Sequence, residues 1–334
     1  MTLEPNSLLT DVEQWLDHRG HDRGPLTPLA GDVSPRRYVR LQTATGPSSI
    51  VAVYPASMRD VGERFIETTR LLAGEDISVP SVLDWDPDAG MMLLSDSGQL
   101  AVHDAVALGA DPKGYWLEAT AILDKIARLD RTTVARLSRP LDGTTLRREL
   151  LQSWDLVLEP AGLVGAGSLT EDFRLALFTL CDRLAEPEPR PCHRDFMARN
   201  LLLDAEDSIV VIDHQDLRLG PPWYDLASLL NDTLYADADE EAKHLDQARV
   251  PRAEREMYHR AAAQRSLKIV GTFAAFAARG VERHLPLIRP SLRAARRHLA
   301  RVAEAAPAMR DLNAAWEAIE GTEVPLLGKP SLLD

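Results

Sequence analysis

The pattern of hydrophobic and polar positions divides the chain near residue 100. In the first hundred residues, apolar side chains recur either at helical spacing or at alternate positions, as in strands. These periodicities predict two helices, over residues 8–18 and 61–72, and four strands, over residues 37–41, 49–54, 79–85 and 91–94. Glycine and proline turns separate the strands. The order of strand, strand, helix, strand and strand predicts a small antiparallel sheet packed with one helix.

Beyond residue 100 the helical periodicity dominates. It predicts six helical segments, over residues 113–130, 144–159, 170–186, 224–235, 252–279 and 290–319. Two apolar, strand-like runs over residues 192–203 and 208–213 interrupt these helices and are joined by a short polar turn. The predicted fold class is therefore α+β, with a small antiparallel-sheet lobe over residues 1–95 and a mostly helical lobe over residues 96–334.

The composition is that of a folded protein with an acidic surface. The chain has 334 residues and a net charge of −13, which argues against a nucleic-acid partner and against an anionic membrane surface. The two cysteines, Cys181 and Cys192, indicate no disulfide framework. The sequence from Met1 shows no signal-peptide pattern, and its apolar runs are shorter than the ~18 residues of a membrane span. We expect a soluble, cytoplasmic protein.

Lysine is scarce in this chain. Of the 38 basic residues, all are arginines except Lys113, Lys125, Lys243, Lys268 and Lys329. The first third of the chain therefore contains no lysine, and no mechanism can use one from that part.

The candidate chemistry lies in the strand-like interruption of the helical region. The sequence there reads His193-Arg-Asp195-Phe-Met-Ala-Arg-Asn200, and the second apolar run ends in Asp213. Phosphoryl transfer to a hydroxyl needs one carboxylate that accepts the hydroxyl proton, with an amide and a second carboxylate that hold a metal ion on the phosphates. Asp195, Asn200 and Asp213 supply these three groups.

These residues resemble the second motif of the protein-kinase-like small-molecule phosphotransferases of the aminoglycoside phosphotransferase type. Gly220 and Asp225-Leu-Ala227 continue the match at the expected spacing. The resemblance implies a bilobal, protein-kinase-like fold that uses ATP and Mg²⁺. It also implies that Asp195 is the catalytic base, that Asn200 and Asp213 are Mg²⁺ ligands, and that His193 and Asp225 support the catalytic loop.

A closer resemblance, to the bacterial anomeric kinases of N-acetylmuramate and N-acetylglucosamine, runs along most of the chain. The similar segments are residues 29–40, 93–98, 213–216 and 264–268. The resemblance implies phosphorylation of the C1 hydroxyl of an amino sugar in cell-wall recycling, by a monomer with a small-molecule partner. The implied nucleotide-binding candidates are Gly31, Ser34, Arg37 and Asp96, and the implied acceptor candidates are Glu149, Arg199, Gln215 and Arg265. The chain departs from the family at Met197-Ala198 and at His214, where the family has an aromatic residue.

Protein kinases hold the nucleotide phosphates with a lysine on the third strand, and the corresponding run here, residues 49–54, has none. Arg37 or Arg40 could replace it. Arg37 shares strand parity with Val39, which predicts that its side chain points inward. Loop amides with Ser34 and Mg²⁺ are a second explanation, and a catalytically dead nucleotide binder is a third.

Two further alternatives stay open at this point. Within the class, the acceptor could be an aminoglycoside or another small alcohol. Outside it, a metal-dependent hydrolase could bind Zn²⁺ or Mn²⁺ through His193, Asp195, Asp213, His214 and Asp216. The hydrolase leaves Asn200 and the segment from Gly220 to Asp225 without a role.

Overall fold

A computed structural model shows how the chain folds. It describes residues 5–22, 24–29, 34–43, 46–164, 168–231 and 237–321. The chain divides into two compact units. Unit 1 comprises residues 1–105 and 200–216, and unit 2 comprises residues 106–199 and 217–334. The segment 200–216 therefore packs with the sheet unit, although the sequence analysis placed it in the helical lobe.

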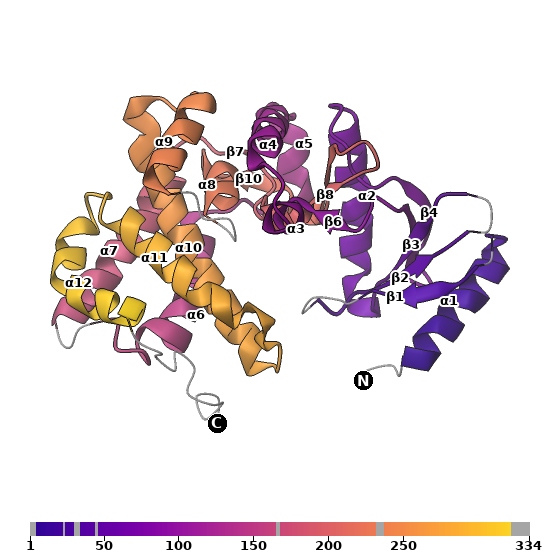
Figure 1. The fold of residues 1–334 in the computed structure, drawn as a ribbon, viewed down its shortest axis with the longest axis horizontal. Coiled ribbons are helices and arrows are strands. Elements are labelled where there is room, and N and C mark those ends of the chain that lie inside the picture. Colours follow the sequence, from indigo (N-terminus) through magenta and orange to yellow (C-terminus); the bar gives the residue numbers. More distant parts are fainter. Residues whose placement is uncertain are drawn as a thin grey trace. The chain divides into compact units, whose positions relative to one another are not determined.

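Unit 1 is built on a five-stranded antiparallel sheet (Figure 1). Its strands are β1 (Leu26–Pro28), β2 (Arg37–Leu41), β3 (Ser49–Val53), β4 (Val82–Asp86) and β5 (Met91–Ser95). They lie in the order β1-β2-β3-β5-β4, and every neighbouring pair is antiparallel. The predicted antiparallel sheet is thus confirmed. The periodicity missed β1 because three residues are too few to show alternation.

The two faces of this sheet are covered by two helices, α1 (Pro5–Arg19) and α2 (Arg59–Ala73). Val39 of β2 and Leu93 of β5 pack with α1, whereas Ala52 of β3 and Leu94 of β5 pack on the side of α2. Alternate residues of each strand therefore enter different apolar clusters, as the period of two requires.

A second, three-stranded sheet attaches the segment 200–216 to unit 1. It contains β6 (Leu100–Ala101), β8 (Leu201–Leu203) and β9 (Ile209–Val211), in the order β6-β8-β9. The backbone N–H of Val211 also donates to the carbonyl oxygen of Ser78, at 2.8 Å. These backbone hydrogen bonds explain why this segment belongs with the sheet unit.

Unit 2 is mainly helical. Its helices are α4 (Pro112–Ile126), α5 (Arg131–Leu137), α6 (Gly143–Ser153), α7 (Ser168–Ala185), α8 (Tyr224–Leu230), α9 (Ala238–Gln247), α10 (Arg255–Ala278), α11 (Ile288–Leu299) and α12 (Ala306–Gly321). The short α3 (Val102–Ala107) spans the junction of the two units, and a π-helical turn over Trp154–Leu158 extends α6. The longest helix, α10, has 24 residues and packs against α6, α8 and α11 (Figure 1).

The helix boundaries differ from the periodicity in several places. The predicted helix 224–235 is α8, which ends at Leu230, and residues 232–235 lie outside the described residues. The short α3 was not predicted. The segment 290–319 is two helices, α11 and α12. The predicted segment 113–130 ends at Ile126, and α5 and α9 were not predicted. The helix α9 is short and rich in charged residues, and it begins at the capping box of Asp237 and Glu240. The signal for α9 therefore lies in its cap more than in an apolar stripe.

The two strand-like runs around the motif are also divided more finely than predicted. In unit 2, β7 (Arg190–Cys192) pairs with β10 (Arg218–Gly220). Residues 193–197 have no regular structure, and a 3-10 turn over Ala198–Asn200 leads into β8. Across the described ranges, no helix is long and apolar enough to cross a membrane.

Candidate active site

Asp225, the second residue of α8, supports the predicted catalytic loop, which comprises residues 193–197 of unit 2. Its carboxylate accepts two backbone hydrogen bonds, from the N–H of His193 at 2.6 Å and from the N–H of Arg194 at 2.8 Å. Arg194 has a left-handed backbone, with φ at 76°. Burial raises the pKa of Asp225, against the opposing effects of His193 and of the two N–H groups. These hydrogen bonds are the ones that its predicted structural role requires.

Asp195 lies at the tip of this loop and contacts two cations from α10. Its Oδ1 is 2.8 Å from Nζ of Lys268 and 2.7 Å from Nη1 of Arg265. Burial opposes ionisation of Asp195, but Lys268 and then Arg265 hold its pKa well below the usual value. Asp195 is therefore an ionised hydrogen-bond acceptor at neutral pH.

Glu149 of α6 takes part in the support of the loop. Its carboxylate accepts a hydrogen bond from Nη2 of Arg194 at 2.8 Å and another from Nε2 of Gln264 at 3.1 Å. The hydroxyl of Tyr224 donates in turn to Gln264, at 2.9 Å. Burial opposes the charge of Glu149, but Lys268 and Arg194 lower its pKa. Glu149 thus has defined protein partners, and its contact with an acceptor stays a prediction.

The other acceptor candidates of unit 2 also have partners within that unit. Arg265 donates from Nε to Oγ of Ser228, at 3.1 Å, in addition to its contact with Asp195. The guanidinium of Arg199 lies 5.5 Å from the ring centroid of Phe273 on α10. A role for either arginine in acceptor binding stays a prediction.

In unit 1, Asp213 follows β9 in a left-handed backbone conformation, with φ at 62°. Such a conformation costs on the order of 1 kcal/mol or more in a non-glycine residue and is concentrated at functional sites. Its Oδ1 accepts hydrogen bonds from Nη2 of Arg36 at 3.1 Å and from Nε2 of Gln215 at 2.7 Å. The Asp213 side chain is 40% exposed. Gln215 therefore orients the predicted metal ligand, and its predicted contact with an acceptor stays untested.

Arg36, rather than Arg37, has the buried side chain that the sequence analysis expected of an arginine at the start of β2. The Arg36 side chain is 10% exposed, whereas Arg37 is exposed at the first position of β2. The prediction that Arg37 points inward is wrong: Arg37 is the first residue of β2 and is exposed, and the side chains of its parity become buried only from Val39 onward. Arg36 also donates from Nε to Oγ of Ser34 at 3.1 Å, and its guanidinium lies 5.9 Å from the Tyr38 ring centroid.

Two further nucleotide-binding candidates lie in unit 1, and a third, Gly31, lies outside the described residues. Ser34 accepts the hydrogen bond from Arg36 just described. The Asp96 carboxylate forms a two-pronged pair with Arg40, at 2.6 and 3.2 Å, and accepts a hydrogen bond from Ser48 at 2.7 Å. Burial opposes the charge of Asp96, but Arg40 and Ser48 lower its pKa. This geometry fits a structural residue of the sheet unit.

His214 stands where the resemblance led us to expect an aromatic residue, and its ring packs against an aromatic side chain. Its ring is buried and stacks on Phe65 of α2, with the centroids 4.5 Å apart, while Nδ1 lies 2.8 Å from Oγ1 of Thr68. The ring thus packs against Phe65 as an aromatic side chain would, and Thr68 fixes its orientation.

Asn200 and Asp213 offer oxygen donors, which are the ligands that Mg²⁺ prefers. The exposed carboxylate of Asp213 and the strained backbone that presents it fit a metal ligand. Residues of unit 1 are therefore chemically suited to hold this ion.

A different cluster has the composition of a metal site, but its contacts explain it without an ion. Glu241, His259 and His298, from α9, α10 and α11, bring possible ligand atoms within 4.8 Å of one another. Glu241 accepts a hydrogen bond from Tyr258 at 2.6 Å and pairs with Arg297 at 3.2 Å. His259 Nδ1 lies 3.0 Å from His298 Nδ1. The negative charge is thus already balanced, and the cluster joins three helices.

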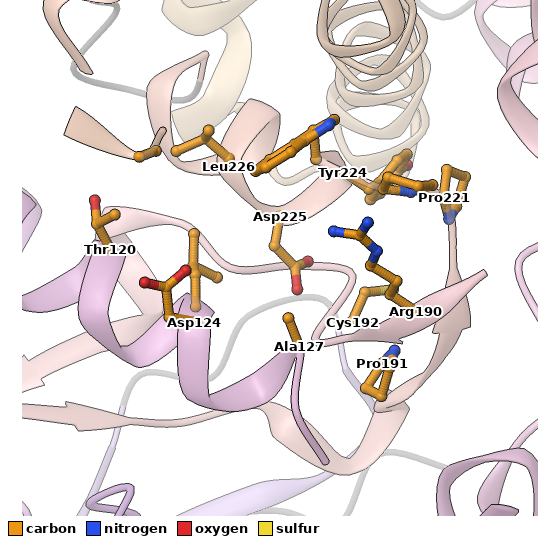
Figure 2. Close-up of a pocket in the computed structure, with 14 residues that line it drawn as sticks. Thr120, Asp124, Ala127, Arg190, Pro191, Cys192, Pro221, Tyr224, Asp225 and Leu226 are labelled. Carbon is orange, nitrogen blue, oxygen red and sulfur yellow. The ribbon is translucent and has the colours of Figure 1, made fainter. Parts of the chain in front are cut away.

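A small cavity lies beside Asp225 (Figure 2). Its volume is about 110 Å³, and Thr120, Asp124, Arg190, Cys192, Trp223 and Asp225 are among its lining residues. Ligand sites usually occupy about 300 Å³ or more, so this cavity is too small for a nucleotide or a sugar. Asp195 does not line it, and we do not associate it with the reaction.

The sheet unit, the helical unit and the supported loop with Asp195 define a protein-kinase-like phosphotransferase with a hydroxyl group as acceptor. The chain belongs to the phosphotransferase enzyme family, whose model matches residues 25–263. The predicted membership and bilobal fold class are confirmed, and this assignment favours phosphoryl transfer over the hydrolase alternative.

Relatives and a solved structure agree with this assignment. An N-acetylmuramate/N-acetylglucosamine kinase of Pseudomonas aeruginosa is 33% identical over 214 residues, which cover 62% of this chain and 60% of the relative. A kinase of the same name from Pseudomonas putida is 31% identical over 297 residues, covering 80% of this chain and 84% of that one. A choline kinase from Streptococcus pneumoniae has a similar fold, with a TM-score of 0.60 at 15% identity, over 91% of this chain and 99% of that one.

Sequence reasoning missed two candidate functional residues, Arg36 in unit 1 and Lys268 in unit 2. Arg36 adjoins the arginine that was chosen, and strand parity pointed to the wrong neighbour. Lys268 had a usable signal, because it is a lone lysine in the apolar stretch of a long helix. A charge in such a stretch needs a partner, but the sequence did not show that the partner is Asp195.

Proposed function

We propose that this protein transfers the γ-phosphoryl group of ATP to the C1 hydroxyl of N-acetylmuramate or N-acetylglucosamine. The supporting observation is the ionised, mostly buried carboxylate of Asp195, fixed on a loop that Asp225 holds through two backbone hydrogen bonds. The names of the relatives support the choice of acceptor.

In the proposed reaction, Asp195 accepts the proton of the C1 hydroxyl as that oxygen bonds to the γ-phosphorus. The bond from the γ-phosphorus to the bridging oxygen breaks, ADP leaves, and the proton passes from Asp195 to solvent. A hemiacetal hydroxyl is more acidic than an ordinary alcohol, so a base with a low pKa suits it. The protein's share of the catalysis is to position this carboxylate and to keep it ionised.

Asn200 and Asp213 are the proposed ligands of Mg²⁺, which would neutralise charge on the nucleotide phosphates. Gln215 fixes one oxygen of Asp213 through its 2.7 Å hydrogen bond. The chain passes from unit 2 to unit 1 between Arg199 and Asn200, so the motif contributes residues to both units.

Arg36 is the proposed replacement for the lysine that protein kinases use on the nucleotide phosphates. It is the arginine next to Asp213, and Ser34 and Tyr38 hold its guanidinium from two further sides. An arginine fork can bind two phosphate oxygens at once, so the lack of lysine in this unit does not imply a lack of nucleotide binding.

The test is ADP release by the purified protein with N-acetylmuramate, N-acetylglucosamine, glucose and kanamycin. We expect Mg²⁺-dependent turnover with an acetylated amino sugar, and a product phosphorus resonance typical of a sugar 1-phosphate. Turnover with kanamycin alone would replace the proposed acceptor by an aminoglycoside. ATP binding without turnover on any acceptor would leave the catalytically dead binder.

A further inference from the structure

The contact between Lys268 of α10 and Asp195 carries a further inference, which rests on the proposed function. We propose that Lys268 is a positioning residue for phosphoryl transfer, which holds the carboxylate of Asp195 in the orientation that accepts the acceptor proton. Nothing in the motif around Asp195 pointed to this lysine, which follows it by 73 residues.

The geometry joins the base to two cations on the same face of one helix. Arg265 and Lys268 are three residues apart on α10, so their side chains project from neighbouring positions. Both reach Oδ1 of Asp195, at 2.7 and 2.8 Å. The orientation of the carboxylate is therefore set by α10 as well as by its own loop.

The two cations differ in how firmly they are held. The Arg265 side chain is fully buried, and Ser228 fixes its Nε. The Lys268 side chain is 13% exposed, and its ammonium group is a compact point charge with three donors. Arg265 therefore acts as a fixed anchor. Lys268 supplies a second donor to the same oxygen from the less enclosed side.

The charges around the proposed base balance only when Lys268 is included. Three cations, Arg194, Arg265 and Lys268, face three carboxylates from α6, α8 and the catalytic loop: Glu149, Asp225 and Asp195. Tyr224, His193 and Cys192 are further titratable groups close to them. Loss of Lys268 would leave this group with one uncompensated buried negative charge, which favours a displaced or neutralised carboxylate.

The first experiment compares Lys268→Met and Lys268→Arg with a control, Lys243→Met, which changes an exposed lysine of α9 in the same unit. We expect Lys268→Met to lower kcat on the order of 100-fold, with the KM for ATP within about twofold of wild type. Lys268→Arg should recover most of this loss, and the control should leave kcat unchanged. A wild-type kcat in Lys268→Met, or equal losses in the Met and Arg variants, would overturn the proposal.

A double-mutant cycle separates positioning from a general structural effect. If Lys268 acts through Asp195, Asp195→Asn combined with Lys268→Met should be no slower than Asp195→Asn alone. Multiplied losses would overturn the role of Lys268. The cycle is measured by ADP release with whichever acceptor of the panel is phosphorylated. Turnover with an unexpected acceptor alone would contradict the proposed function. Multiplied rate losses in the double variant would contradict the role of Lys268, whichever acceptor is used. Thermal melting of each variant verifies that it is folded.

Discussion

Unit 1 and unit 2 both hold carboxylates against basic side chains, but the basic residues differ. In unit 1, where lysine is absent, Asp96 pairs with Arg40 and Asp213 with Arg36. In unit 2, Asp195 contacts a lysine as well as an arginine. The Arg40 pair is two-pronged and buried, which suits a carboxylate that must stay in place. Asp195, the proposed base, is instead held partly by the compact ammonium group of a lysine.

Asp96 and Asp195 both form ion pairs, but we expect Asp96 to stabilise unit 1 and Asp195 to take part in the reaction. The partners of Asp96 belong to the sheet unit and fix the ends of its strands. Asp195 lies on a loop that is itself held by backbone hydrogen bonds. The following variants test whether one carboxylate serves stability and the other chemistry.

The largest effect is expected for Asp195→Asn, which removes the proposed base and nearly preserves the shape of the side chain. We expect kcat to fall on the order of 1,000-fold, about 4 kcal/mol, because the amide cannot accept the proton. ATP affinity, measured by calorimetry, should stay near that of wild type. A wild-type kcat in this variant would contradict the role of Asp195 as the base.

Asp96→Asn should act on stability rather than on chemistry. Breaking the buried pair with Arg40 should lower the free energy of unfolding by about 3 kcal/mol, measured by urea denaturation. The matched control is Asp60→Asn, which breaks the pair of Asp60 with Arg64, where the aspartate side chain is 67% exposed. That change should cost about 0.5 kcal/mol or less. Equal effects of the two variants would show that the Arg40 pair does not stabilise unit 1.

The Asp96 pair should also depend on pH. Its pKa is lower in the folded than in the unfolded chain, so its contribution is present above the unfolded value and is lost as the pH falls through the folded one. We expect the stability gap between wild type and Asp96→Asn to persist from pH 7 to pH 5 and to narrow below about pH 4. A gap that is constant down to pH 3 would contradict this linkage.

A smaller effect is expected from the two neighbouring arginines of unit 1. Arg36→Met should raise the KM for ATP about tenfold, because it removes the cation beside Asp213. Arg37→Met, at an exposed position one residue later, should leave it within about twofold. Steady-state kinetics with varied ATP distinguish them. The reverse result would restore Arg37 as the residue that replaces the missing lysine.

The sequence predicted features that depend on neighbouring residues, but it did not predict contacts between residues far apart along the chain. The strands predicted over residues 37–41 and 91–94 follow from local runs of apolar residues, and the structure confirms them within one residue. The exposure of Arg37 does not follow from that alternation, because it depends on which positions at the start of β2 other elements cover. His214 is a similar case, since its packing on Phe65 joins residues 149 positions apart.

By itself, the sequence determined the α+β class, the order of the main elements, the motif with Asp195, Asn200 and Asp213, and the absence of lysine from the first third. These properties reside in local periodicity, spacing and composition. Only the tertiary structure decided that Arg36 is the arginine beside Asp213, that Arg40 is bound to Asp96, and that Lys268 touches Asp195. An ion pair forms within a few ångströms, and chain folding alone decides which distant charges come that close.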